Sequence, residues 1–310
     1  MNKLCDGVFE GGGMRGIGLV GAVARLEKEG YKFRHVAGSS AGAIVASLVA
    51  AGYDSEELYQ VMKNVDFERF KAPHWRGLGP MGLLLNAGKN FGIYSPDLFE
   101  NWLADLLARK NVYTFADLPE GKLRVTASDV TDERVLVLPN DLAGFGINPK
   151  GFKVATAVRM SMGIPVFYEP YELTDVNGDI HYIVDGGMLA NYPVWILDDG
   201  SKQLDLPLFG FRFVHHKGRS KSKKPHLLTY LKQIINTIIE ANDDECGVIV
   251  RGDLQRTIYI DTRVGDTVVG ITDFNLPMEK IEGMYHNGYD SCHAFLHTWD
   301  LKHWNNAFRR

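Results

Sequence analysis

The sequence predicts an α/β fold for this chain of 310 residues. Near the N-terminus, two segments each have the pattern of a short strand, a glycine-containing turn and an apolar helix. Further strand-like segments alternate with helical ones along the chain, and the hydrophobic content of 45% is sufficient for a substantial core. We therefore expect one large globular domain with an appended C-terminal portion.

The first of these segments runs from a predicted strand at 4–10 to a predicted helix at 17–29. Between them, Gly11-Gly12-Gly13-Met14-Arg15-Gly16 matches G-x-G-x-x-G, the dinucleotide-binding loop, so a nucleotide-binding module is one non-enzyme alternative. That loop also needs an acid at the end of the next strand, where the sequence has Arg34-His35-Val36-Ala37 instead. Alternatively, the backbone N–H groups of such a turn bind an oxyanion beside a nucleophile. Arg15 then either adds positive charge to the turn or pairs with an acid on the surface.

The second segment contains Gly38-Ser39-Ser40-Ala41-Gly42, which matches the G-x-S-x-G nucleophile elbow. A strand at 33–36 precedes it and an alanine-rich helix at 41–51 follows it, as such an elbow requires. Because the helix begins just after Ser40, its unpaired N–H groups and positive dipole end point at the serine oxygen. We expect Ser40 to be the nucleophile, with Gly38, Ser39, Ala41 and Gly42 completing the elbow.

The middle of the chain supplies scaffold elements and one irregular segment. Asp54 and Glu57 have the spacing of a capping box at a helix start. Residues 67–94, which include Trp75, are rich in glycine and proline without a clear period, and long loops of this kind are often lids or binding loops. The other predicted elements here are helices at 95–109 and 152–160 and strands at 122–128, 134–138 and 166–173.

A short apolar strand at 181–184 leads directly into Asp185-Gly186-Gly187. An acid followed by two glycines at a strand end can present its carboxylate to a cleft while the backbone turns away. Aspartate before glycine is also a common turn pair, so this motif gains meaning only together with the two upstream motifs.

The C-terminal third has predicted strands at 206–214 and 257–261 and predicted helices at 227–241 and 278–301. Five positive residues and no acid occur in Lys217–Lys224. This run has two interpretations, an attraction for anionic lipid head groups or a solvated loop.

Charge and cysteine content limit the possible partners and compartments. The formal net charge is −4, which argues against nucleic acid as the main partner. Cys5, Cys246 and Cys292 lack the spacing of metal ligands and are predicted to be free thiols in a reducing compartment. The N-terminus lacks the features of a signal peptide, and the apolar run at 44–51 is too short to span a bilayer. We expect a cytoplasmic protein with peripheral membrane contact and without a metal or cofactor.

The three motifs together, GGGMRG, GSSAG and DGG in this order, resemble the patatin-like phospholipase family. The SMGIP sequence before the Asp185 strand is also similar to that family. The resemblance implies a three-layer α/β/α fold with a central, mostly parallel sheet. It covers residues 1–200 as the catalytic domain, and residues 201–310 are expected to complete that domain or pack on it.

The resemblance also implies a Ser–Asp dyad, with Ser40 as nucleophile and Asp185 as base, that hydrolyses acyl esters of phospholipids or lysophospholipids. The remaining site residues that it implies are the oxyanion loop, Gly11, Gly12, Gly13, Met14, Arg15 and Gly16, and the glycines of the acidic motif, Gly186 and Gly187. The expected partner is a lipid or membrane surface, contacted through the Trp75 loop and Lys217–Lys224.

Two other enzyme interpretations use the same serine. One is an acyltransferase or thioesterase acting on soluble acyl carriers. The other is a Ser–acid–His triad, for which His215 and His216 follow Asp185 in the required order. A triad would not explain why the glycine-rich run precedes the serine, nor why Asp185 is followed by two glycines. The sequence therefore favours the dyad. His35, near the elbow, is interpreted as a strand residue.

Overall fold

The structure, a computed structural model, describes residues 3–71, 88–198, 200, 203–214, 216, 230, 231, 233–239, 251–271, 273 and 275–309. Trp75, His215, Cys246 and the basic run Lys217–Lys224 lie outside the described residues.

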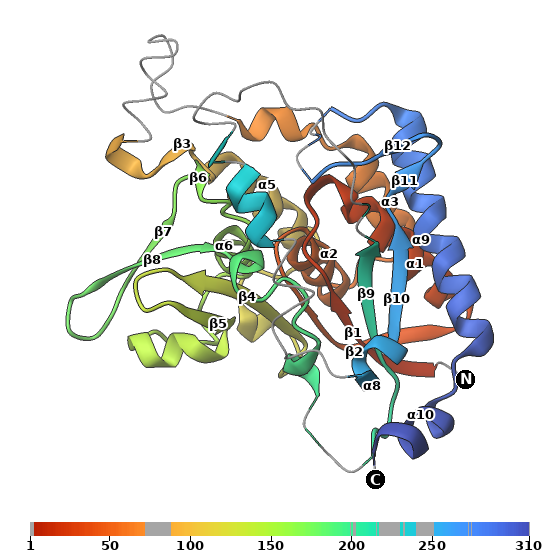
Figure 1. Cartoon of the computed structure of the whole chain (residues 1–310). Helices are drawn as coiled ribbons and strands as arrows, with labels where there is room; N and C mark the ends of the chain where they lie inside the picture. The colour runs from red at the N-terminus through yellow and green to blue at the C-terminus, as the bar shows by residue number, and fades with distance from the viewer. Residues whose placement is uncertain are drawn as a thin grey trace.

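A central sheet runs through the described part of the chain in the order β10-β9-β1-β2-β4-β8-β7, with β5 also paired to β4 (Figure 1). From β10 to β4 the strands are parallel, whereas β5 and β8 run antiparallel to β4, and β7 runs antiparallel to β8. The sheet is therefore mixed at one edge. Its strands are β1 (Lys3–Phe9), β2 (Tyr31–Gly38), β4 (Leu123–Asp129), β5 (Arg134–Leu138), β7 (Tyr171–Thr174), β8 (Ile180–Asp185), β9 (Leu208–Val214) and β10 (Thr257–Asp261).

Both faces of the central strands are covered, because successive residues of a strand point to opposite faces and here both sets are apolar. Phe9 belongs to the larger hydrophobic cluster, and its ring stacks on Phe211 of β9 with centroids 4.6 Å apart. The preceding residue, Val8, belongs to a second and smaller cluster with Tyr192 and Val194. The sheet thus lies between two packed layers.

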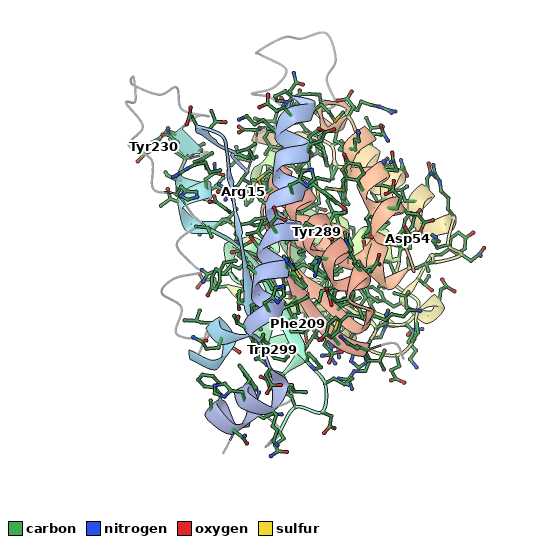
Figure 2. All side chains as sticks on the ribbon, turned by 90° about the vertical axis from the view of Figure 1, so that its right-hand side faces the viewer. Arg15, Asp54, Phe209, Tyr230, Tyr289 and Trp299 are labelled. Atoms are coloured by element: carbon green, nitrogen blue, oxygen red, sulfur yellow. The ribbon has the colours of Figure 1, made fainter. Side chains whose placement is uncertain are left out.

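Helices flank this sheet, and α9 lies along α1 (Figures 1 and 2). Glycines permit this close approach, since a β-carbon on Gly21 would lie 1.9 Å from the Tyr285 carbonyl oxygen. No helix within the described residues is long and apolar enough to cross a membrane. The helices are α1 (Gly16–Lys28), α2 (Ala41–Ala50), α3 (Ser55–Asn64), α5 (Asp97–Ala108), α6 (Val154–Ser161), α8 (Arg251–Gln255), α9 (Met278–Thr298) and α10 (Leu301–Phe308).

Two stretches differ from the sequence prediction. The segment at 67–94, predicted to be irregular, has a short helix at η2 (Phe67–Phe70) and a strand at β3 (Gly92–Tyr94) within its described parts. The single strand predicted at 166–173 is divided into β6 (Val166–Tyr168), which pairs with β3, and β7, which pairs with β8. Pro170 lies between the two and has no N–H to donate to a continuous ladder.

The C-terminal third contributes to the same sheet as the N-terminal strands. Asp6 to Phe9 of β1 are paired with Leu208 to Phe211 of β9, and β10 continues the sheet beyond β9. The helix α3 begins with the predicted capping box, in which Asp54 accepts from the Glu57 N–H and Glu57 accepts from the Asp54 N–H.

Candidate active site

The ends of β2 and β8 bring two sequence motifs into contact. Gly38 at the end of β2 is in register with Val125 of β4, and Asp185 at the end of β8 is in register with Ala127 of the same strand. The Ser40 hydroxyl donates a hydrogen bond of 2.8 Å to the Oδ2 atom of Asp185, across 145 residues of sequence. The structure therefore joins the two side chains that the sequence marks as nucleophile and base.

The backbone of Ser40 is strained. Its φ of 50° and ψ of −122° lie in a region that residues other than glycine rarely adopt. Its N–H donates to the Ser161 hydroxyl at 2.8 Å, which fastens the elbow to the last residue of α6. A β-carbon on Gly38 would lie 2.4 Å from the Gly42 carbonyl oxygen, and one on Gly42 would lie 2.2 Å from the Phe9 carbonyl oxygen. Both glycines are thus required for the sharp turn beside β1.

Asp185 is almost completely buried, with 1% of its surface exposed. Burial raises the pKa of its carboxyl group to about 7, although hydrogen bonds from the Gly187 N–H and the Ser40 hydroxyl partly oppose the rise. The Gly187 bond is 2.8 Å long and reaches Oδ1, so the other oxygen is left to face the serine. A carboxylate with a pKa near neutrality is suited to accept a proton and return it.

The loop at residues 11–16 lies beside the serine and is held by two distant segments. A β-carbon on Gly11 would lie 3.1 Å from the β-carbon of Ser40. The Gly11 N–H donates to the Asn191 carbonyl at 3.1 Å, and the Asn191 side chain donates back to the Gly11 carbonyl at 3.3 Å. The Met14 N–H donates to the Ile271 carbonyl at 3.0 Å. The loop is therefore fixed in position before any substrate binds.

Two backbone donors of this loop remain available. In the described part of the chain, neither the Gly12 N–H nor the Gly13 N–H has a hydrogen-bond acceptor. Gly13 has φ of +54°, and a β-carbon there would lie 2.0 Å from the Ile271 carbonyl oxygen, so only glycine fits. Unpaired N–H groups on a rigid turn can bind an oxyanion.

Arg15 is buried, with 5% of its surface exposed, and its Nε donates to the Val269 carbonyl at 2.8 Å. Arg15 therefore does not lie on the surface. Its positive charge instead stays within the fold next to the glycine run.

Sequence reasoning missed the residues that hold the site together. Ser161 lies in the SMGIP sequence, which the sequence analysis singles out. Its hydrogen bond with the Ser40 N–H is not predictable from that motif. Asn191 had no signal in the sequence. Val269 and Ile271 act through their carbonyl oxygens, which every residue type possesses, so no side-chain pattern could have identified them.

The polar contacts of His216 and His35 are made with residues other than Ser40 and Asp185. The Nε2 atom of His216 lies 2.5 Å from Asp261, and its Nδ1 lies 3.2 Å from the Arg263 guanidinium. His35 faces Asp6 at 3.5 Å, and burial lowers the pKa of its ring. Among the described residues, no histidine forms a hydrogen bond with Ser40 or Asp185. A triad through His216 is therefore not supported, and His215 lies outside the described residues.

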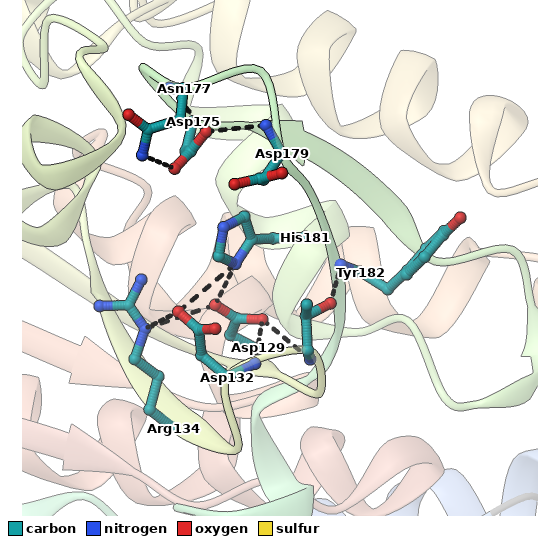
Figure 3. Close-up of polar contacts among 9 residues, drawn as sticks. Asp129, Asp132, Arg134, Asp175, Asn177, Asp179, His181 and Tyr182 are labelled. Carbon is teal, nitrogen blue, oxygen red and sulfur yellow. Dashed lines mark hydrogen bonds and ion pairs between the residues drawn. The ribbon is translucent and has the colours of Figure 1, made fainter.

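A second polar cluster lies at the opposite end of β8 (Figure 3). His181 Nδ1 lies 2.9 Å from Asp129 Oδ2 and 3.6 Å from Asp132, and the Arg134 Nε lies 3.4 Å from Asp129. These three acid and imidazole groups have the spacing of metal ligands. However, Oδ1 of Asp129 already accepts two backbone N–H groups, and Arg134 already balances the charge. We interpret the cluster as a clamp between β8 and the β4–β5 turn.

Comparison with known proteins identifies a matching family and two related sequences. A family profile described as Patatin-like phospholipase matches residues 7–198. The uncharacterized protein YqhO of Bacillus subtilis (strain 168) is 37% identical, over 95% of this chain and 98% of its own. The uncharacterized protein R571 of Acanthamoeba polyphaga mimivirus is 23% identical, over 91% of this chain and 90% of its own.

Two solved structures share the fold. VipD from Legionella pneumophila has a TM-score of 0.53 at 18% identity, over 96% of this chain and 67% of VipD. ExoU from Pseudomonas aeruginosa, solved with SpcU, has a TM-score of 0.52 at 16% identity, over 96% of this chain and 52% of the matched chain. This protein thus spans about half the length of that ExoU chain, and at these identities the likeness shows the fold alone.

Proposed function

Because this chain belongs to the patatin-like phospholipase family and is a lipid hydrolase, we propose that it cleaves fatty-acyl esters of phospholipids or lysophospholipids through an acyl-serine intermediate. The observation that carries this proposal is the hydrogen bond of 2.8 Å from the Ser40 hydroxyl to the buried carboxylate of Asp185.

In the first half of the reaction, Asp185 takes the hydroxyl proton while the Ser40 oxygen attacks the ester carbonyl. The negative charge that develops on the carbonyl oxygen is stabilised by the N–H groups of Gly12 and Gly13 and by the N-terminus of α2. The tetrahedral intermediate then collapses, and the leaving alcohol takes the proton from Asp185. The acyl group is left on Ser40.

In the second half, a water molecule attacks the acyl-serine while Asp185 accepts one of its protons. Collapse releases the fatty acid and returns the proton to the Ser40 oxygen, so the enzyme is regenerated. No histidine is required, because a carboxyl group with a pKa of about 7 can both accept and return a proton near neutral pH. None of these steps requires a metal ion or an organic cofactor.

Substrate profiling tests this function. The purified protein is supplied with phosphatidylcholine vesicles, lysophosphatidylcholine and a soluble acyl thioester, and released fatty acid is measured. We expect release from the phospholipid or the lysophospholipid, and loss of that release after treatment with a fluorophosphonate, which reacts with activated serines. Cleavage of the soluble thioester alone would contradict the lipid substrate and would favour the acyl-carrier alternative.

A further inference from the structure

The turn at the end of α6 forms hydrogen bonds with both members of the candidate dyad. Ser161, the last residue of α6, accepts a hydrogen bond of 2.8 Å from the Ser40 N–H through its hydroxyl oxygen. Two residues later, the Gly163 carbonyl accepts a hydrogen bond of 3.0 Å from the Asp185 N–H. One short segment, Ser161–Gly163, therefore holds the backbone of the nucleophile and the backbone of the base.

This segment is held firmly within the fold. The helix α6 contacts α2, which begins directly after Ser40, and β8, which ends at Asp185 (Figure 1). The Ser161 side chain is fully buried. A hydrogen bond in such an interior is strong, and removal of one partner leaves the other unsatisfied. The Ser161 hydroxyl is thus a fixed anchor for the Ser40 N–H.

The anchor acts at a strained point of the chain. A conformation with the φ and ψ of Ser40 persists only where the surrounding structure fixes it. The Ser40 side chain leaves from the same α-carbon, so relaxation of these angles would turn its hydroxyl. The hydroxyl would then leave the Asp185 carboxylate, which it now reaches at 2.8 Å.

We propose that Ser161 is a positioning residue, whose hydroxyl holds Ser40 in the conformation in which the nucleophile reaches Asp185. Ser161 acts through Ser40 and transfers no proton itself. This inference rests on the proposed function, since both require a working Ser40–Asp185 dyad, but it does not depend on which acyl ester is cleaved. A displacement of about 1 Å at reacting atoms can cost about a hundredfold in rate.

The titration of Asp185 distinguishes this role from a purely structural one. Burial raises the pKa of Asp185 to about 7, and the hydrogen bond from the Ser40 hydroxyl is one of two that limit the rise. The other comes from the Gly187 N–H, and no charged side chain among the described residues contributes to the shift. Loss of the Ser40 bond should therefore raise the pKa of Asp185 further, whereas a loss of stability alone would leave it unchanged.

The test compares Ser161→Ala with a matched control in the same helix. Thr156→Val also removes a buried hydroxyl from α6, but that hydroxyl donates to the Glu100 carboxylate. For each protein, kcat and KM for a soluble short-chain ester are measured as a function of pH. Urea unfolding is followed in parallel by tryptophan fluorescence, to which Trp299, packed on Phe209 of the central sheet, contributes (Figure 2).

We expect Ser161→Ala to lower kcat by about tenfold to a hundredfold and to leave KM within about twofold of wild type. A displaced nucleophile slows the chemical step without weakening the binding of substrate. The inflection of the pH–rate profile should move to higher pH by about one unit, the size expected for the loss of one hydrogen bond to a carboxylate. Thr156→Val should keep the wild-type inflection and a kcat within about twofold.

A wild-type kcat in Ser161→Ala would overturn the inference, and so would a lowered kcat with an unchanged inflection. Unfolding of Ser161→Ala under conditions in which Thr156→Val stays folded would also overturn it, in favour of a structural role. If the wild type cleaves the soluble ester but neither phospholipid nor lysophospholipid, the proposed function fails while the two variants still decide the role of Ser161. A wild type that cleaves no ester would contradict both, because the dyad would not be functional.

Discussion

Replacement of Ser40 with alanine should lower kcat/KM for lipid and short-chain esters by at least about 10⁴-fold. The nucleophile is lost, and an acyl-serine can no longer form. What remains is the binding of substrate and of its oxyanion, which accelerates the reaction far less than covalent catalysis. Initial rates with a chromogenic short-chain ester measure this loss without a lipid interface.

Ser47→Ala is the matched control for this variant. Ser47 is another serine of the same region, in α2, where it is buried and its hydroxyl donates to the Ile44 carbonyl within the helix. Its replacement should leave the rate within about twofold of wild type, because no atom of the site is removed. Substantial turnover by Ser40→Ala would show that another residue is the nucleophile.

Asp185→Asn should lower kcat by about 10³-fold to 10⁴-fold, because the amide cannot accept the serine proton. In the wild type, the base acts only when it is deprotonated, so the rate should rise with pH and level off above a pKa of about 7. This inflection should be absent from the residual rate of the variant.

Asp129→Asn provides a control with another buried aspartate of the same sheet, one that contacts His181 rather than Ser40. It should keep the wild-type shape of the pH–rate profile even if the fold loses some stability. An inflection near neutral pH that persists in Asp185→Asn would assign the titration to a different group.

The Asp185→Asn variant should also change how the free energy of unfolding depends on pH. The pKa of Asp185 rises from 3.8 to about 7 in the folded chain, so the folded state holds this proton more tightly than the unfolded state. Wild-type stability should therefore fall as pH rises from about 4 to about 7, by roughly 4 kcal/mol at most. Urea unfolding should show this fall in the wild type and its absence in Asp185→Asn, and parallel curves would contradict the burial argument.

The sequence identified much of this site because its chemistry depends on particular residue types. A sharp turn with a projecting serine needs small neighbours, so Gly38 and Gly42 leave a readable pattern. A carboxylate at a strand end is also readable, and the structure brings Asp185 to Ser40 from 145 residues away. The patatin-like α/β class expected from these motifs is confirmed by the family match and by the fold.

Other features depend on backbone geometry and long-range packing, which leave little trace in the sequence. The carbonyls of Val269 and Ile271 hold the glycine loop, but any residue type could supply them. The strand predicted at 166–173 is divided because its two halves have different partners, and pairing partners are set by the whole sheet. The buried position of Arg15 follows from the C-terminal segment packed over it, which no local pattern indicated.

Direct detection of the acyl-enzyme tests the central claim, that Ser40 carries the acyl group and Asp185 moves the proton. The wild type is mixed with a slowly hydrolysed long-chain ester, quenched in acid, digested and analysed by peptide mass spectrometry. We predict the mass of one acyl group on the peptide that contains Ser40, with much less of it in Asp185→Asn at equal reaction times. An acyl group on any other residue, or turnover without an acylated Ser40, would contradict this account.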